Sequence, residues 1–131
     1  MMLIGRIAKE NSSLWSAEVG SIGAFTQGAS RADAASMLAE VIELMVERPG
    51  FKVTVTEIAK DDEGILVDAT EPSSLAAQVL KYQRQVRGLS FAGVAKLVGN
   101  SSRNAYARYE QGQIEPTLRK LRELLTAVAP A

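Results

Sequence analysis

The chain has 131 residues, of which 47% are hydrophobic and 23% are charged, the balance of a folded soluble protein. It contains no cysteine and no histidine, which excludes disulfides, Cys/His metal sites and acid–base catalysis by histidine. We therefore expect no cofactor. Among catalytic mechanisms, one that uses carboxylates alone is still possible. No segment reads as a signal peptide or membrane span, so we expect a cytoplasmic protein without membrane contact.

The net charge of zero hides a division along the chain. Residues 1–70 carry six basic and eleven acidic side chains, whereas residues 71–131 carry nine basic and four acidic ones. Such an asymmetry predicts different partners for the two halves. The alternative is that residues 61–63 form a solvated acidic turn and that the rest of the charge difference between the halves arose by chance. We place the domain boundary near residue 70, which predicts domains 1–70 and 71–131.

The first half reads as short strands around one helix. Three runs are β-compatible before the helix: Met2–Ala8, Leu14–Val19 and Ala24–Gln27. Ser30 is placed to cap the helix, with Asp33 three residues later, and Pro49-Gly50 ends it. Phe51–Ile58 then alternates apolar and polar residues as a strand does. The predicted order is β-β-β-α-β, an α+β unit, followed by a polar turn and the apolar run 65–67.

The second half reads as four helices, because it lacks strand-like alternation and is punctuated by glycine and proline. The predicted helices are Leu75–Arg87, Ser90–Val98, Arg103–Gln111 and Thr117–Val128. The second and third are joined by a short turn that contains Gly99. This is the layout of a helix-turn-helix domain, whose second helix enters the major groove of DNA.

The predicted second helix of this motif has two different sides. At about 100° per residue, Ala105, Tyr106 and Tyr109 fall on one side, where they can pack against the preceding helix at Val94, Ala95 and Val98. Residues of the types that read DNA bases fall on the other side of the helix: Arg103, Asn104 and Arg108. Arginine pairs with guanine and asparagine with adenine in bidentate geometry. Ser101 and Ser102 stand at the helix start, where a phosphate is favoured. The alternative is a structural bundle whose arginines are solvated.

The segment "GLSFAGVAKLVGNSSRNAYARYEQGQIEPTLRKLREL" resembles the helix-turn-helix family of the lambda repressor and Cro type. The similarity includes Val94-Ala95, Glu110 followed by Gly112, and Pro116, and it covers nearly all of residues 75–129. The family's base-reading positions fall on the same three residues of the predicted second helix. Phe91 departs from the family, which usually has a polar residue there, and the turn is one residue longer.

The segment "SLWSAEVGSIGAFTQGASRADAASMLAEVIELMV" is similar to the N-terminal domain of the HicB family of antitoxins. The shared elements are an aromatic-containing strand, a glycine, a Thr-Gln-Gly step at residues 26–28, and an Ala-rich helix. Gly20-Ser21 and Asp33-Ala34 stand where that family usually has a proline and a Glu-Ala pair. The resemblance implies a partial ribonuclease-H-like fold without catalysis. It also implies binding of a HicA-like, mRNA-cleaving toxin and repression of the protein's own operon.

Catalysis by a ribonuclease-H mechanism would need clustered carboxylates that hold divalent metal. The strand Met2–Lys9 carries none, so we expect that the chain is not an enzyme and binds no metal. The carboxylates of the predicted helix, Glu40, Glu43 and Glu47, could instead form an acidic face for a basic toxin. Solvated surface positions are the alternative reading of each.

Three classes of function stay open at this point. The first is an antitoxin that also represses its operon, with operator DNA and a HicA-like toxin as partners. The second is a stand-alone transcription regulator with a sensing domain, and the third is a metal-dependent nuclease. Each half is small for an independent core, and helix-turn-helix dimers read paired half-sites. We therefore expect a homodimer or a dimer of dimers.

Overall fold

The structure is a computed structural model that describes residues 2–58, 62–99 and 103–129. The chain divides into two compact units, Met1–Leu75 and Ala76–Ala131. The predicted boundary near residue 70 lies just before the helix in which this division falls. None of the helices among the described residues is long and apolar enough to cross a bilayer.

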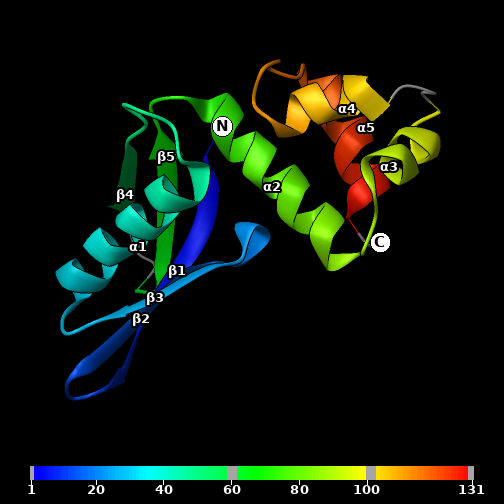
Figure 1. The fold of residues 1–131 in the computed structure, drawn as a ribbon. Helices are drawn as coiled ribbons and strands as arrows, with labels where there is room; N and C mark the ends of the chain where they lie inside the picture. The colour runs from blue at the N-terminus through cyan, green and yellow to red at the C-terminus, as the bar shows by residue number, and fades with distance from the viewer. Residues whose placement is uncertain (1, 59–61, 100–102, 130–131) are drawn as a thin grey trace. The chain divides into compact units, whose positions relative to one another are not determined.

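The N-terminal unit is a five-stranded sheet with one long helix (Figure 1). Every neighbouring pair of strands is antiparallel, and the order across the sheet is β3-β2-β1-β5-β4. Helix α1 follows β3 and precedes β4 in the chain. The elements are β1 (Leu3–Asn11), β2 (Leu14–Val19), a 3-10 turn η1 (Gly20–Ile22), β3 (Ala24–Gly28), α1 (Arg31–Val46), β4 (Val53–Glu57) and β5 (Gly64–Ala69).

The predicted order β-β-β-α-β is wrong in one respect, because it omits β5. This strand lies in the interior of the sheet between β1 and β4, and it pairs with both. Its buried side chains, Ile65 and Val67, are the apolar run that the sequence showed but did not assign. Six residues after a polar turn are too few for periodicity to separate a strand from a loop. The interior place of the strand also depends on pairing with β1, which lies far away in sequence.

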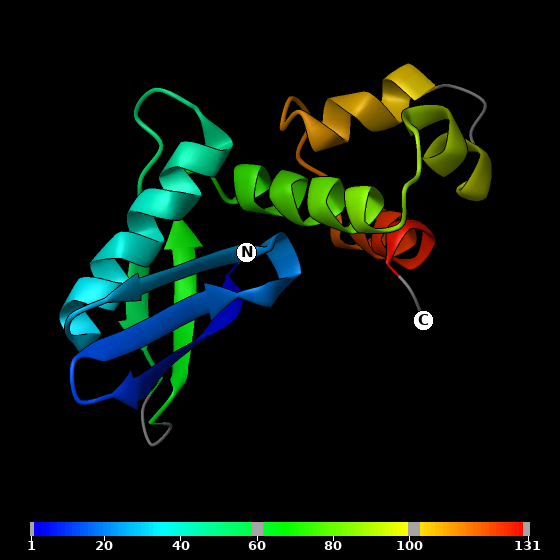
Figure 2. The ribbon, with the colours of Figure 1, turned by 60° about the horizontal axis from the view of Figure 1, so that its bottom comes forward.

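Helix α1 covers one face of the sheet, and the core lies between them (Figures 1 and 2). Alternate residues of β1, β2 and β5 point toward this core and meet three buried residues of α1, which are Ala34, Leu38 and Ile42. The opposite face of the sheet keeps large apolar side chains in solvent: Ile4 is 72% exposed and Phe25 57%.

The start of α1 is fixed by capping and by a glycine. The Ser30 hydroxyl accepts a hydrogen bond from the Asp33 N–H at 3.1 Å, and the Asp33 carboxylate accepts one from the Ala29 N–H at 2.9 Å. This confirms the predicted cap. Gly28, just before it, lies so close to α1 that a Cβ there would come within 2.5 Å of the Ala34 nitrogen. The Thr-Gln-Gly step therefore lets the helix pack directly on the end of β3.

All the regular structure among the described residues of the C-terminal unit is helical, as predicted. Its elements are α2 (Pro72–Val86), which begins in the N-terminal unit, α3 (Phe91–Leu97), α4 (Arg103–Glu110) and α5 (Leu118–Val128). One apolar cluster joins all four helices; its buried members are Leu80, Val94, Tyr106, Leu124 and Val128. Each predicted helix is confirmed to within a few residues at its ends, where boundaries are least certain.

Candidate nucleic-acid interface

Helices α3 and α4 form the two arms of the motif. The Ser90 hydroxyl caps α3 by accepting a hydrogen bond from the Gly93 N–H at 3.0 Å. After α3, Gly99 adopts a left-handed backbone with φ of 75°, which suits the glycine found there. The cap at Ser90 and the glycine at position 99 thus bound α3 at its two ends.

The inner side of α4 packs into the domain core. Tyr106 is only 2% exposed and belongs to the cluster with Val94, and Tyr109 and Val98 pack at its margin. This agrees with the sides assigned to the helix from its sequence. Because the aromatic side is anchored, the rotation of α4 about its own axis is fixed.

The outer side of α4 carries three exposed side chains, Arg103, Asn104 and Arg108. None of them has an ion pair with another residue that the structure describes. Two guanidinium groups and an amide therefore face solvent from one short helix, a set that can donate to guanine and pair with adenine. Ser101 and Ser102, the predicted phosphate contacts, lie outside the described residues.

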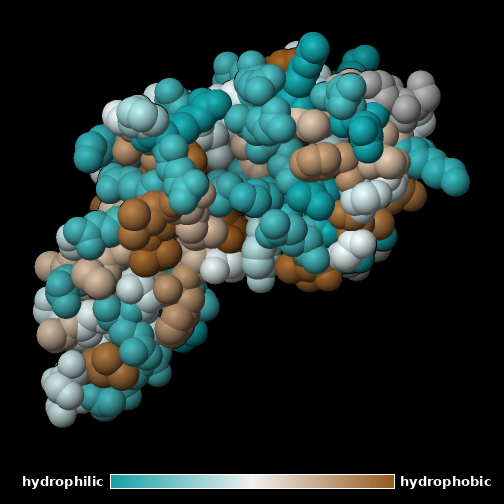
Figure 3. Space-filling model, viewed as in Figure 1, coloured by the Kyte–Doolittle hydropathy of each residue, from teal (hydrophilic) through white to brown (hydrophobic). Residues whose placement is uncertain are grey.

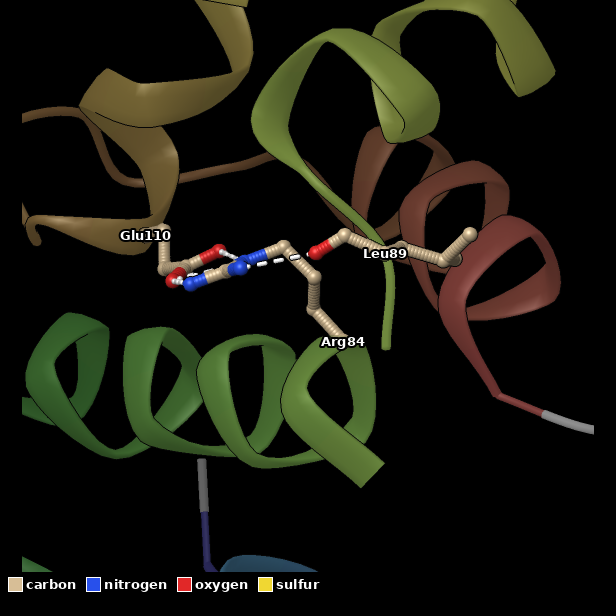
Figure 4. Close-up of polar contacts among 3 residues, drawn as sticks. All are labelled: Arg84, Leu89 and Glu110. Carbon is tan, nitrogen blue, oxygen red and sulfur yellow. Dashed lines mark hydrogen bonds and ion pairs between the residues drawn. The ribbon is translucent and has the colours of Figure 1, made fainter. Parts of the chain in front are cut away.

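A buried ion pair holds α4 against α2 (Figure 4). The Arg84 guanidinium donates to both carboxylate oxygens of Glu110, at 2.7 to 3.1 Å, and also to the Leu89 carbonyl at 2.8 Å. The two side chains are only 16% and 4% exposed. Bidentate pairing of this kind fixes geometry as well as adding energy, so it sets the last turn of α4 relative to α2. The hydrogen bond to Glu110 raises the pKa of Arg84, which stays charged.

Phe91 completes this arrangement. The Arg84 guanidinium lies 4.5 Å from the centre of its ring, and the Tyr106 ring centre is 6.1 Å away. Phe91 therefore packs within the domain at the start of α3, and its side chain has no hydrogen-bonding group to offer to a DNA backbone.

The sequence does not predict the buried pair. Glu110 belongs to the pattern that resembles the lambda repressor and Cro type, but Arg84 stands in a different helix, and no local signal links the two. Since the pair is separated by 26 positions, periodicity within either helix gives no information about it.

The acidic candidates lie on the other unit. Glu40 and Glu47 are exposed at the C-terminal end of α1, whereas Glu43 is half-buried and its carboxylate accepts a hydrogen bond from the Val53 N–H at 2.9 Å. All three line one open hollow with the residues that follow α1. Among the residues that the structure describes, Glu43 thus has an internal side-chain partner, whereas the carboxylates of the two exposed glutamates have none.

Comparison with known proteins bears on the helical unit. Residues 75–129 match the family model described as a helix-turn-helix domain. No curated protein and no solved structure matches the chain. The C-terminal helices therefore form a helix-turn-helix domain, as the sequence predicted. DNA binding and regulation of transcription are the functions that such a domain supports.

Proposed function

We propose that this chain is an antitoxin of a toxin–antitoxin pair and the repressor of its own operon. In this proposal the sheet unit binds and blocks a HicA-like, mRNA-cleaving toxin, while the helix-turn-helix domain binds operator DNA. The observation that carries the proposal is the union of an acidic sheet unit with a basic helix-turn-helix domain in one chain. Opposite charges suit a basic, RNA-binding protein on one side and DNA phosphates on the other.

The similarity of residues 2–58 to the N-terminal domain of HicB antitoxins supports the toxin-binding half. The glycine of the Thr-Gln-Gly step is required by the packing of this unit, because α1 begins so close to Gly28 that a larger side chain would not fit. A partial ribonuclease-H-like relationship and the absence of catalysis are parts of the same proposal. So is the use of the glutamates at the end of α1 in toxin binding.

The exposed side of α4 supports the DNA-binding half. We assign base reading to Arg103, Asn104 and Arg108, and phosphate contacts to Ser101 and Ser102. A homodimer would present two such helices to half-sites about 34 Å apart, and a dimer of dimers would bind two operators.

Co-expression with the protein encoded beside this chain tests the antitoxin role. We expect the neighbour alone to stop growth, and this chain to restore growth and co-purify with it. The purified complex should bind the DNA upstream of the pair in a fluorescence anisotropy assay. A harmless neighbour that forms no complex would refute the antitoxin role and leave the DNA-binding domain as it is.

A second candidate is a stand-alone transcription regulator that senses a small molecule. It is favoured by a hollow of about 340 Å³ on the sheet face opposite α1, lined in part by Thr54, Thr56 and Leu66. This volume is within the usual range for small-ligand sites. Operator affinity that changes with a metabolite mixture, but not with the neighbouring protein, would support this candidate over the first.

A further inference from the structure

An open hollow of about 520 Å³ lies where α1 ends and the chain turns toward β4. Its walls combine the last turns of α1 with the loop that follows, and they mix acidic, basic and apolar residues. Drawn from the side on which α1 lies, the surface shows apolar patches bordered by polar ones (Figure 3). The lining residues are Glu40, Glu43, Leu44, Glu47, Arg48, Gly50, Phe51 and Lys52.

An apolar and acidic stripe runs along α1 into this hollow, and we call it the α1 stripe: Met37, Glu40, Leu44 and Glu47. These positions are three or four residues apart, so they share one side of the helix up to its cap at Glu47. Leu44 is 73% exposed and Met37 is 38% exposed. An exposed leucine between two exposed carboxylates contributes nothing to the core, which is already filled by Leu38 and Ile42.

The carboxylates of the α1 stripe are available to a partner. The arginines of this unit are used elsewhere: Arg6 pairs with Glu63, Arg31 with Glu57 and Arg48 with Glu71. Glu40 and Glu47 form no ion pair with any residue that the structure describes. Two cations also line the hollow, Lys52 and Arg48, the latter paired with Glu71, and a basic partner would have to avoid both.

We propose that the α1 stripe docks a basic amphipathic helix of the partner protein, with an apolar side chain over Leu44 and cations on Glu40 and Glu47. The two glutamates are about 10 Å apart along the helix axis, the rise of seven residues. A partner helix with two basic residues seven positions apart, and leucine-like residues between them, matches this spacing. This inference rests on the proposed function, because it assigns the surface that meets the toxin. It also replaces Glu43 with Leu44 as a contact.

A designed peptide tests the site without the toxin. The probe is a helical peptide of about 15 residues, with lysines seven positions apart and leucines between them. Titrated into the full chain, it should shift the methyl NMR signals of Met37 and Leu44 and leave those of Ile4 unchanged. Glu40→Lys with Glu47→Lys should weaken binding at least tenfold, since two attractions of up to about fivefold each become repulsions. Lys52→Ala should strengthen it.

The matched control is Glu10→Lys with Asp62→Lys, which makes the same change of net charge at exposed sites elsewhere in the unit. It should leave peptide binding within about twofold of the wild type. Equal weakening by both double variants, shifts centred on Ile4, or no binding at millimolar peptide would overturn the site.

The same variants separate this inference from the proposed function. If the neighbouring protein forms a complex that survives Glu40→Lys with Glu47→Lys, the antitoxin role holds and the α1 stripe is not its docking site. If the peptide binds as described but the neighbouring protein does not, the stripe is a docking site and the antitoxin role is wrong. Leu44→Asp should abolish peptide binding while the unfolding transition stays in place, because Leu44 is exposed.

Discussion

The two units of this chain use arginine in opposite ways. In the sheet unit, Arg6, Arg31 and Arg48 pair with carboxylates at the surface; the side chains of the Arg6–Glu63 pair are each more than half exposed. In the helix-turn-helix unit, Arg84 and Glu110 form a buried, bidentate pair. A surface pair is weakened by water and salt and adds little to stability. A buried pair holds together the elements that supply it, because separating the partners would leave an uncompensated charge in the interior.

This difference suits the two proposed tasks. The proposed base readout would require that Arg103 and Arg108 keep one orientation, and the pair at the end of α4 helps to hold that helix. The proposed recognition of a basic protein would require accessible carboxylates, and the sheet unit leaves Glu40 and Glu47 at its surface.

Removal of the buried carboxylate should destabilise the helical unit strongly. Glu110→Ala leaves the Arg84 charge buried without its partner, which costs about 3–5 kcal/mol. Urea unfolding followed by circular dichroism should show the loss. Trp15, the single tryptophan of the chain, lies in the sheet unit and reports on that unit by fluorescence. The urea midpoint measured by Trp15 fluorescence should move much less than the midpoint measured by circular dichroism.

A double variant sharpens this test. Arg84→Met with Glu110→Leu removes both charges, so it should recover most of the stability that Glu110→Ala loses. Equal shifts of the circular dichroism and Trp15 midpoints in Glu110→Ala would contradict the view that the pair acts within the helical unit alone.

Removal of either exposed arginine of α4 should weaken DNA binding without unfolding the domain. Arg103→Ala or Arg108→Ala should each cost about 1–3 kcal/mol of affinity for the DNA upstream of the gene and relax preference at one base position. Fluorescence anisotropy with the native and base-substituted duplexes measures both effects. Lys9→Ala, a matched loss of one exposed positive charge in the sheet unit, should change affinity little. Unchanged base preference in both arginine variants would show that α4 is not the recognition helix.

The sequence predicted the helical unit more completely than the sheet unit, for a physical reason. Helices α2 to α5 are specified by nearby residues: Ser90 and Thr117 cap two of them, and Gly88 and Gly112 have positive φ after two others. The sides of α4 followed from periodicity alone. What the sequence did not give was the Arg84–Glu110 pair, because that contact joins different helices.

The strand order of the sheet unit depends in part on residues that are distant in sequence, so the sequence predicts this unit less completely. The capped helix and the first four strands had local signals, such as Ser30 before α1 and the alternation of residues 51–56. The local signal for the interior strand β5 is only an apolar run of three residues. Its register is set by two neighbours, the preceding strand β4 and the strand β1 more than fifty positions earlier. The acidic residues were identified as candidates by type, but the internal hydrogen bond of Glu43 and the exposure of Leu44 required the structure.

An exposed pair should behave as the contrast to Glu110. Glu57→Ala removes the surface partner of Arg31 and should cost only about 0.2–1 kcal/mol of the free energy of unfolding, measured by Trp15 fluorescence. The Arg31 guanidinium lies 5.8 Å from the Trp15 ring centre, so the emission of the folded state should also change. Asp62→Ala, another exposed carboxylate of this unit, should leave that emission as it is. A loss as large as that of Glu110→Ala would remove the distinction between the two units.

The smallest effect at neutral pH is expected beside the buried pair itself. The Tyr106 hydroxyl is buried and makes no hydrogen bond with the residues described, so Tyr106→Phe should change stability little at pH 7. Burial, together with the negative charge of Glu110, raises the pKa of Tyr106 well above its ordinary value near 10. The folded state therefore holds this proton more tightly than the unfolded state. That stability is complete below about pH 10 and is lost as the pH rises beyond it.

Urea unfolding of the helical unit at several alkaline pH values measures this loss. Tyr106→Phe should be the more stable protein at high pH, by a margin that grows from about pH 10 upward. Tyr82→Phe makes the same chemical change on α2. In this variant the free energy of unfolding should still fall at alkaline pH as it does in the wild type, because Tyr106 is present. Parallel declines in the wild type and Tyr106→Phe would mean that this tyrosine can ionise without leaving its place beside Glu110. The interior around the Arg84–Glu110 pair would then be open to water, and the large cost predicted for Glu110→Ala would fall with it.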